Sequence, residues 1–302
     1  MRLKDVERGT GGEVENMERG TGGGYFSRMP VSISRRRFLI AAGGALGAAA
    51  LADGFLLEPG AIEVTRHDLP VPGLPPDLSG LRVAAISDVH LAGGVHAVAR
   101  ATLAHLARER PDVVLLIGDI CNQRSDLAHL VAWARDARGT RATFATLGNW
   151  EHEAGIDRAT AERAYGSVGV ELLYNSSGRV GTLTFVGIDD PVEGEPNLAT
   201  AVRGVEADDP ALWVLHGPGF VDGVPRAMFP HPAAIIAGHT HGGQIRLPFY
   251  TPYVPTGSGR FVAGWYRDTV APLYVTRGIG TVTVPARLFC PPELTLFTLR
   301  PA

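Results

Sequence analysis

The sequence has 302 residues but only two cysteines, Cys121 and Cys290, and a single lysine, Lys4, among its 28 basic residues. Two thiols are too few for a disulfide framework or for a zinc site built from cysteines. Positive charge is not in excess either, because the formal net charge is −3. Recognition of a phosphate backbone requires a basic patch or stripe, so we expect no nucleic-acid partner.

Aromatic residues are also few, at 7%, but hydrophobic residues make up 45% of the chain, which is typical of a globular protein. The first 28 residues differ from this average. They are rich in glycine and repeat the sequence Glu-Arg-Gly-Thr-Gly-Gly at 7–12 and 18–23. Such a segment has little apolar surface to bury, so residues 1–28 are predicted to be a disordered extension.

Residues 29–57 resemble a twin-arginine export signal. Ser34–Leu39 reads Ser-Arg-Arg-Arg-Phe-Leu, and an Ala/Gly-rich apolar run follows it. Ala50–Ala52 has the small-x-small pattern of a signal peptidase site. We therefore expect the twin-arginine export machinery as a partner and an extracytoplasmic location, in the periplasm or on the outer face of the cytoplasmic membrane. The alternative is a membrane-spanning helix, and whether the signal is cleaved or kept as an anchor stays open.

Residues 58–79 contain five prolines and are predicted to be an extended linker, which leaves 80–302 as the folded domain. Within that domain, two segments show helical spacing of apolar residues, Val98–Arg110 and Leu127–Ala137. They separate the first three of five short apolar runs that are typical of buried strands. The five runs are Leu81–Ile86, Val113–Ile117, Thr143–Leu147, Leu212–Leu215 and Ala233–Ala237. This alternation predicts βαβ units, in which ligands bind beyond the carboxyl ends of the strands.

Polar side chains that can bind metals follow each of these runs. They are Asp88, His90, Asp119, Asn149, His216, His239 and His241. Carboxylates, imidazoles and an amide oxygen suit manganese, iron or zinc. Seven ligands are too many for one tetrahedral ion, so we predict two divalent or trivalent ions that share a carboxylate.

The ordered set D-x-H, G-D, G-N, H and G-H-T-H resembles the calcineurin-like metallophosphoesterases, and its last motif is similar to that of an exported bacterial phosphodiesterase branch. The resemblance implies a four-layer αββα sandwich, in which helices flank two mixed β-sheets and the dinuclear site lies at strand ends. It implies the following ligands: Asp88, His90 and His241 on one ion, Asn149, His216 and His239 on the other, and Asp119 bridging both. The implied reaction is hydrolysis of a phosphomonoester or, by preference, a phosphodiester through a hydroxide that bridges the metals.

The sequence departs from the family pattern at Trp150, where these enzymes usually have a histidine that assists the leaving group. His152 is the candidate replacement, and with Asn149 it forms the predicted catalytic pair. The alternatives are that catalysis relies on the metals alone, or that the chain is an impaired, metal-binding scaffold. Asn122 takes the place of a second acid and is expected to orient a ligand.

Two further features have open interpretations. The apolar stretch Leu247–Pro255 either rests on a membrane or lines a pocket for a lipid-like group, or it is an ordinary loop. A lipid-linked or envelope-linked phosphate ester and a membrane surface are therefore candidate partners. Arg277 and Arg287 either pair with a phosphate or stabilise the closing loops.

Overall fold

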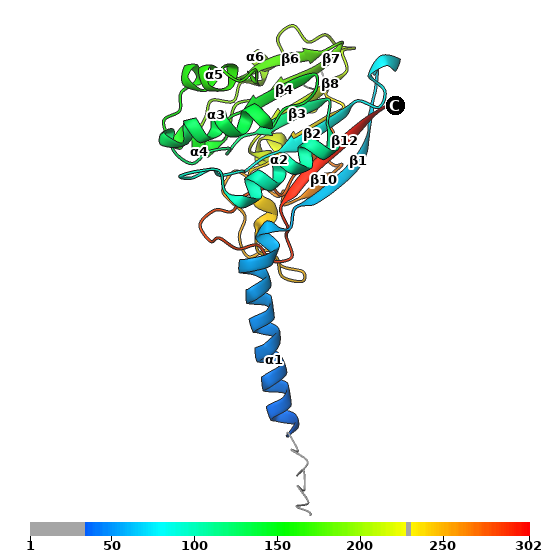
Figure 1. Ribbon diagram of the computed structural model, residues 1–302. Helices are drawn as coiled ribbons and strands as arrows, with labels where there is room; N and C mark the ends of the chain where they lie inside the picture. The colour runs from blue at the N-terminus through cyan, green and yellow to red at the C-terminus, as the bar shows by residue number, and fades with distance from the viewer. Residues whose placement is uncertain (1–33, 228–230) are drawn as a thin grey trace, which may run out of the picture. The chain divides into compact units, whose positions relative to one another are not determined.

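The computed structural model describes residues 34–227 and 231–302 (Figure 1). The predicted extension, 1–28, and the first part of the predicted export signal, 29–33, lie outside the described residues. The chain divides into two units, residues 1–44 and 45–302. Helix α1 (Arg35–Ala52) begins in the first unit, and none of its side chains is buried. In the described part of the chain, Arg35–Gly60 is the one helical segment whose length and composition would let it cross a membrane.

The first sheet of the second unit has six strands in the order β1-β12-β2-β3-β4-β5. These are β1 (Glu63–Val71), β12 (Glu293–Pro301), β2 (Arg82–Ile86), β3 (Val113–Ile117), β4 (Ala142–Thr146) and β5 (Glu171–Leu172). Only the pair of β12 and β2 is antiparallel among the described neighbours, so the sheet is mixed.

The second sheet has the order β10-β11-β9-β8-β7-β6. Its strands are β10 (Gly264–Tyr266), β11 (Leu273–Val275), β9 (Ala234–Ala237), β8 (Ala211–Leu215), β7 (Leu183–Gly187) and β6 (Ser176–Val180). The four central strands are parallel, and the two edge strands are antiparallel to their neighbours.

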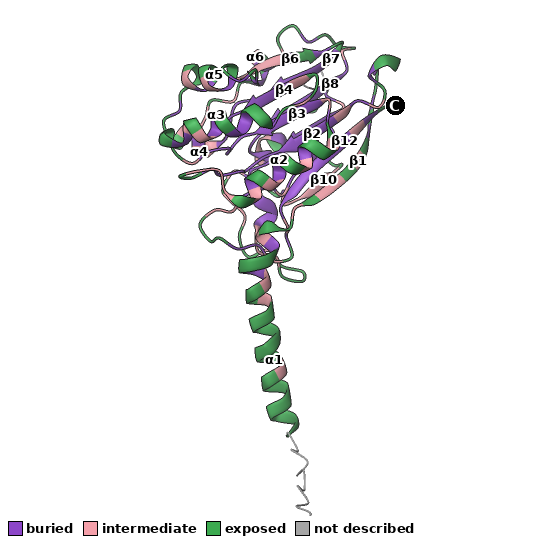
Figure 2. Cartoon of the chain, in the orientation of Figure 1, coloured by how far each residue is buried: buried purple, intermediate pink, exposed green. Residues whose placement is uncertain are grey.

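Alternating residues of each strand face different layers of the core, because successive side chains of a strand point to opposite faces. In β3, Val114 and Leu116 pack with residues of α2 (Ala97–Glu109), α3 (Leu127–Asp136) and α5 (Arg158–Gly166). The intervening residues of β3 pack between the sheets against β7, β8 and β9. The outer face of the second sheet is covered by the short α6 (Leu198–Ala201) and by loops. The predicted four-layer α/β sandwich is thus confirmed, and its central strands are the most buried elements (Figure 2).

The predicted linker, 58–79, differs in the structure, where it supplies β1 and two short 3₁₀ helices. β1 pairs in parallel with β12 along its whole length, from Glu63 to Val71. Pro70 is compatible with this position because β1 lies at the edge of the sheet, where one side of the backbone needs no ladder partner. Pro70 and Pro72 therefore mark the end of an edge strand rather than a connector.

Candidate metal centre

Two clusters of buried side chains lie where the central strands of both sheets end. The first consists of Asp88, His90 and His241, and the second of Asp119, His216 and His239. Within each cluster one ligand atom per residue lies within 4.8 Å of the others. Six of the seven predicted metal ligands are therefore brought together from positions as far apart as β2 and the segment after β9.

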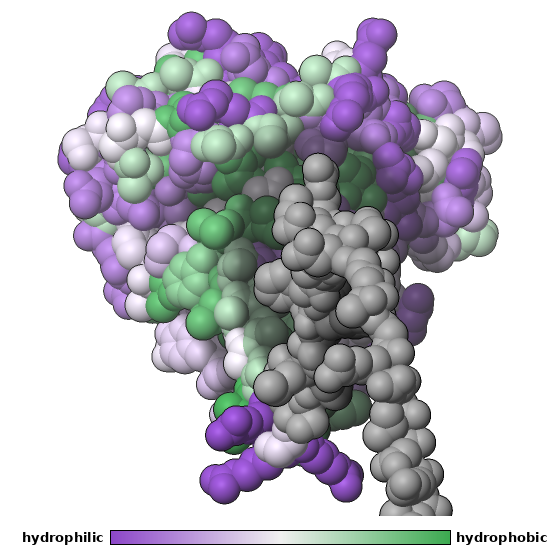
Figure 3. Space-filling view, turned by 60° about the horizontal axis from the view of Figure 1, so that its bottom comes forward, coloured by the Kyte–Doolittle hydropathy of each residue, from purple (hydrophilic) through white to green (hydrophobic). Residues whose placement is uncertain are grey.

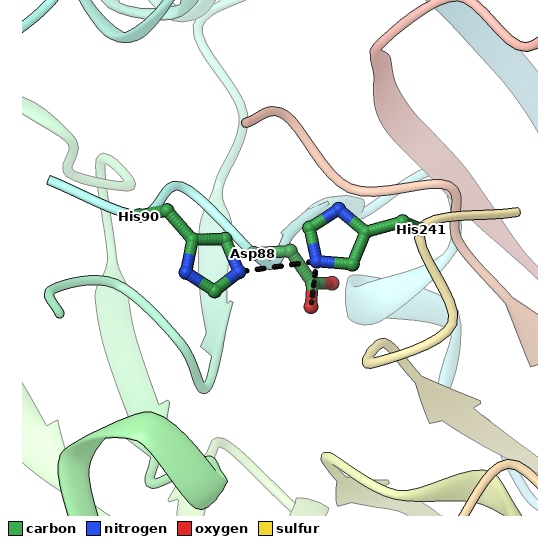
Figure 4. Close-up of side chains that lie close together, drawn as sticks. All are labelled: Asp88, His90 and His241. Carbon is green, nitrogen blue, oxygen red and sulfur yellow. Dashed lines mark hydrogen bonds and ion pairs between the residues drawn. The ribbon is translucent and has the colours of Figure 1, made fainter. Parts of the chain in front are cut away.

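The ring nitrogens of the first cluster point toward one another and toward a carboxylate (Figure 4). His90 Nε2 lies 3.1 Å from His241 Nε2, which is 3.4 Å from Asp88 Oδ1. In the second cluster, His216 Nε2 lies 3.1 Å from Asp119 Oδ2 and 3.3 Å from His239 Nδ1. Asp119 Oδ2 is also 3.7 Å from His90 Nε2, so this oxygen faces both clusters.

Each aspartate has one oxygen fixed by the protein and the other directed at the cluster. Asp88 Oδ2 accepts a hydrogen bond from the Ser87 hydroxyl. It accepts a second from the backbone N–H of His239, at 3.0 Å. Asp119 Oδ1 accepts from the Trp150 backbone N–H at 2.9 Å. Asp88 Oδ1 is buried and has no hydrogen-bond partner among the residues that the structure describes. Since an orphaned buried carboxylate oxygen is costly, this arrangement fits a bound cation.

Three of the four histidines use their outer nitrogen in a hydrogen bond to an oxygen. His90 Nδ1 contacts Asn122 Oδ1 at 2.7 Å, His216 Nδ1 contacts the Ile117 carbonyl at 2.8 Å, and His239 Nε2 contacts the Thr256 carbonyl at 2.7 Å. A carbonyl oxygen can only accept, so the outer nitrogen holds the proton. When the ring is neutral, the inner nitrogen has a free lone pair, which is the state in which a histidine binds a metal.

The backbone at these ligands is unusual for residues with side chains. Five of the six have φ between +51° and +71°, in the left-handed region. These are Asp88, His90, Asp119, His239 and His241. Left-handed backbone at a non-glycine residue costs energy and tends to occur at functional sites. Neighbouring glycines make room: a Cβ at Gly148 would lie 2.3 Å from Asp119 Oδ1.

Electrostatics divides the protons unevenly between the two clusters. Burial lowers the pKa of His241 well below its usual value, and the neighbouring His90 lowers it further. Burial also acts to lower the pKa of His216, but the carboxylate of Asp119 raises it well above the usual value. Burial opposes ionisation of Asp119, yet His216 lowers its pKa to about 2. A cation in the second cluster would therefore displace a proton from His216, as metal binding to imidazoles generally does.

The comparison with known families agrees with this donor set. Residues 81–243 match the family described as calcineurin-like phosphoesterase, which is more than half of the chain. The chain belongs to that family. Together with the two buried clusters, membership makes the protein a metal-dependent phosphoesterase, a hydrolase of phosphate esters.

Relatives in several organisms match this calcineurin-like phosphoesterase over most of its length. It is 29% identical over 285 residues to the uncharacterized metallophosphoesterase YkuE of Bacillus subtilis, covering 89% of this chain and 98% of the relative. It is 29% identical over 283 residues to the phosphodiesterase YaeI of Escherichia coli, covering 88% and 99%. A transmembrane protein with metallophosphoesterase domain from Bos taurus is 27% identical over 260 residues, covering 79% and 57%.

The seventh predicted ligand, Asn149, begins the short helix α4 (Asn149–Glu153). Its amide nitrogen donates to Glu153 Oε1 at 3.2 Å, and within the described part of the chain its buried Oδ1 has no hydrogen-bond partner. Trp150 lines the cleft beside the clusters, and its ring centroid lies 5.3 Å from that of His90. His152 Nε2 is hydrogen bonded to Asp189 Oδ1 at 2.8 Å.

Glu151 was not among the predicted functional residues, but its buried carboxylate holds the loop that carries Asp119. It accepts hydrogen bonds from four backbone N–H groups, those of Asp119, Ile120, Cys121 and Gly148, at 2.6–3.1 Å. Burial and then the charge of Asp119 raise its pKa to about 7. A glutamate at the third position of a helix, as in a capping box, is the sequence signal that could have identified it.

The two arginines with open roles both stabilise the closing segment. Arg287 is fully buried and donates to the carbonyls of Arg277, Gly278, Gly280 and Cys290. Arg277 pairs with Glu293 at 3.2 Å and with Glu63 at 2.7 Å. Both cysteines are free and buried, and burial raises the pKa of each thiol, as expected for packing residues rather than nucleophiles.

Proposed function

We propose that this phosphoesterase hydrolyses phosphodiesters with a pair of manganese, iron or zinc ions held by the seven ligands above, Asp119 lying between them. The observation that carries the proposal is the position of Asp119 Oδ2, which faces His216 at 3.1 Å and His90 at 3.7 Å. Two bound cations would supply a hydroxide nucleophile near neutral pH and offset the charge of the phosphoryl group. The name of the relative YaeI, a phosphodiesterase, supports the same substrate class.

The walls of the cleft favour a substrate of low negative charge. The cleft beside the clusters has a volume of about 450 Å³ and includes the exposed carboxylates Glu153 and Glu193. Among the described residues that line it, none is lysine or arginine. A phosphomonoester carries nearly two negative charges at neutral pH and a diester one, so repulsion by the two glutamates disfavours the monoester.

His152 is the proton donor in this proposal. It lies three residues after Asn149 on α4, and positions i and i+3 share a helix face. His152 is not itself among the residues that line the cleft; a Cβ at Gly194 would lie 2.8 Å from His152 Nε2, so the ring packs against the loop that carries Val192 and Glu193 into the cleft. The change His152→Ala should lower kcat by about 10²-fold for an alkyl leaving group. It should have little effect for p-nitrophenol, which leaves without protonation. Equal losses for both would show that the metals act without this acid.

The proposal also places the enzyme outside the cytoplasm. Arg35, Arg36 and Arg37 directly precede the apolar segment of α1, and positive charge tends to keep the preceding end of such a segment in the cytoplasm. The domain that follows would then lie on the other side, whether the helix is cleaved or retained. The twin-arginine pattern supports export in the folded state.

The assay that tests this function uses the full chain with manganese, iron or zinc. We expect it to hydrolyse bis-p-nitrophenyl phosphate at least about tenfold faster than p-nitrophenyl phosphate. Asp119→Asn should abolish turnover, and the combined change of Glu153→Gln and Glu193→Gln should narrow the preference for the diester. Retention of metal with no turnover on either ester would instead support a metal-binding scaffold.

A further inference from the structure

An apolar cavity adjoins the metal cleft. Its volume is about 610 Å³, within the usual range for sites that enclose a small molecule. Its walls come from the loops after β9 and before β12. The apolar members of the lining are Ile245, Pro252, Tyr253, Pro255, Val282 and Val284. Among the described lining residues none is aspartate, glutamate, lysine or arginine.

The cavity and the metal cleft have a common wall. His241, a predicted metal ligand, lines both, and so do Tyr253, Pro255, Val282 and Thr283. A molecule whose phosphate lies at the clusters can therefore place an adjoining apolar group in the cavity. The position of the cavity makes it a candidate subsite for one of the two ester groups of a diester.

Large apolar side chains are exposed around the cavity. The exposed fraction of the residue is 47% for Leu247 and 62% for Phe289, and Phe249 is fully exposed. Hydrophobic residues gather on the face of the molecule that Figure 3 turns toward the viewer. Clustered exposed aromatic and aliphatic groups of this kind are typical of binding or membrane-contacting surfaces.

The backbone at the two phenylalanines strengthens this interpretation. Phe249 has φ of +70° and Phe289 has φ of +52°, the left-handed region that bulky residues rarely adopt. Each residue thus combines an unfavourable backbone conformation with an exposed aromatic ring. Neither feature stabilises the isolated fold, and strained backbone of this kind clusters at functional sites and ligand clamps.

The loops that carry these residues are held in place by a framework of hydrogen bonds. The amide group of Gln244 bonds to both the N–H and the carbonyl of Val282 and to the carbonyl of Val284. The carboxylate of Glu58 accepts hydrogen bonds from the backbone N–H of Phe289, at 2.8 Å, and of Cys290. Glu58 lies near the end of Arg35–Gly60, the segment that could cross a membrane. If that segment enters a bilayer, the loop with Phe289 is anchored at its exit.

We propose that the substrate is an amphipathic phosphoester from a lipid surface, with its phosphate at the metal clusters and its apolar chain in the cavity. Leu247, Phe249 and Phe289 contact the lipid surface, and the apolar chain of the substrate passes from that surface into the cavity. This inference rests on the proposed phosphodiesterase function and adds the substrate class to it.

The first experiment compares methyl p-nitrophenyl phosphate with octyl p-nitrophenyl phosphate, both as monomers below the micellar concentration, using the full metal-loaded chain. Both diesters release the same phenol, so only the alkyl chain differs. We expect kcat/KM to be at least about tenfold higher for the octyl ester. Equal values for the two esters would overturn this inference and leave the proposed function intact. Failure to hydrolyse either ester would instead contradict the proposed function.

Substitutions in the cavity wall show where the alkyl chain of the substrate binds. Val284→Asp should reduce the octyl-to-methyl ratio toward one, whereas Val284→Leu should keep it high. Ala159→Asp on α5 adds the same charge at an exposed position outside the cavity lining, and its ratio should equal that of the wild type. If the octyl-to-methyl ratio of kcat/KM is unchanged in a folded Val284→Asp variant, the alkyl chain binds elsewhere. That result would overturn the assignment of the cavity as its binding site.

A second experiment distinguishes a lipid surface from a free amphiphile as the source. The full chain with Phe249→Trp is placed in phosphatidylcholine vesicles with brominated acyl chains, and the fluorescence added by the new indole is measured. We expect quenching of this signal but not of the signal added by Ala159→Trp. Equal, unquenched signals would overturn the contact with lipid and leave a free amphiphile as the substrate.

Discussion

The side-chain oxygen of Asn122 lies 2.7 Å from Nδ1 of His90, on the side of the ring that faces away from the metal clusters. This contact fixes the orientation of the ring and the proton on Nδ1. The inner nitrogen is then free to bind a cation. Asn122 was expected from its place in the sequence to orient a ligand, and the structure shows which ligand it contacts.

Replacement of Asn122 should weaken metal binding without removing a ligand. For Asn122→Ala we expect the affinity for manganese to fall by about 10–100-fold, the usual cost of losing such an outer contact. Isothermal titration calorimetry, in which manganese is added to the metal-free protein, measures the change in affinity. Asn122→Asp keeps an acceptor at the same place and should retain the affinity. Equal loss in both variants would contradict a role as hydrogen-bond acceptor.

Glu151→Gln should destabilise the fold more than its small change in shape suggests. The carboxylate accepts four backbone N–H groups, whereas an amide has one acceptor oxygen and directs its NH₂ group at the remaining donors. We expect the free energy of unfolding to fall by about 2 kcal/mol or more in a denaturant titration. Glu153→Gln, an exposed neighbour, serves as the control and should change it by less than about 0.5 kcal/mol.

The ion pair of His152 and Asp189 makes part of the stability depend on pH. Burial opposes both charges, but the hydrogen bond with Asp189 raises the pKa of His152 above 6.5, and the same bond lowers the pKa of Asp189 below 3.8. A raised histidine pKa contributes stability that is complete below pH 6.5 and is lost as pH rises through the folded value. A lowered aspartate pKa contributes stability that is present above pH 3.8 and is lost as pH falls through the folded value.

The pair should therefore stabilise the protein most between about pH 4 and pH 6.5. His152→Ala should lower the free energy of unfolding by about 1–3 kcal/mol at pH 5.5, and by less at pH 9. A double-mutant cycle with Asp189→Asn isolates the coupling. A coupling energy that is the same at both pH values would mean that the histidine is not charged in the folded state.

Arg35 and Arg36, the first two residues of α1, offer a test of the export route. Replacing Arg35 and Arg36 with lysine keeps the positive charge, so insertion of an ordinary spanning helix would be unaffected. If the segment is a twin-arginine signal, this variant should remain in the cytoplasm while the wild type appears in the membrane or periplasmic fraction. Immunoblots of fractionated cells measure the outcome, and normal export of the variant would contradict this route.

Much of the sandwich could be predicted from the sequence because its central strands are short, continuous apolar runs that are buried on both faces. Val113–Ile117 was predicted with the bounds of β3, and Ala233–Ala237 differs from β9 by one residue. β1 was missed because its prolines and alternating polar residues are typical of a connector. Its place in the sheet depends on pairing with β12, more than 200 residues away, which no local pattern encodes.

The ligand set was predictable for a related reason: its members follow buried strands whose ends must meet at one edge of each sheet. The local sequence does not show how the carboxylates are oriented. Glu151 is two residues after Asn149 in the chain, but it acts on the backbone after β3. Likewise, Asp88 and His239 have left-handed backbone, which no local pattern in the sequence predicted.

The central claim is that Asp88, Asp119, His239 and their neighbours hold two cations at once, and metal stoichiometry tests it most directly. The full chain, loaded with manganese and freed of excess ion, should contain two ions per chain by elemental analysis. Crystals should show two anomalous peaks about 3.5–4 Å apart on either side of Asp119. One ion or none per chain, or two peaks that remain in place after Asp119→Asn, would contradict the shared site.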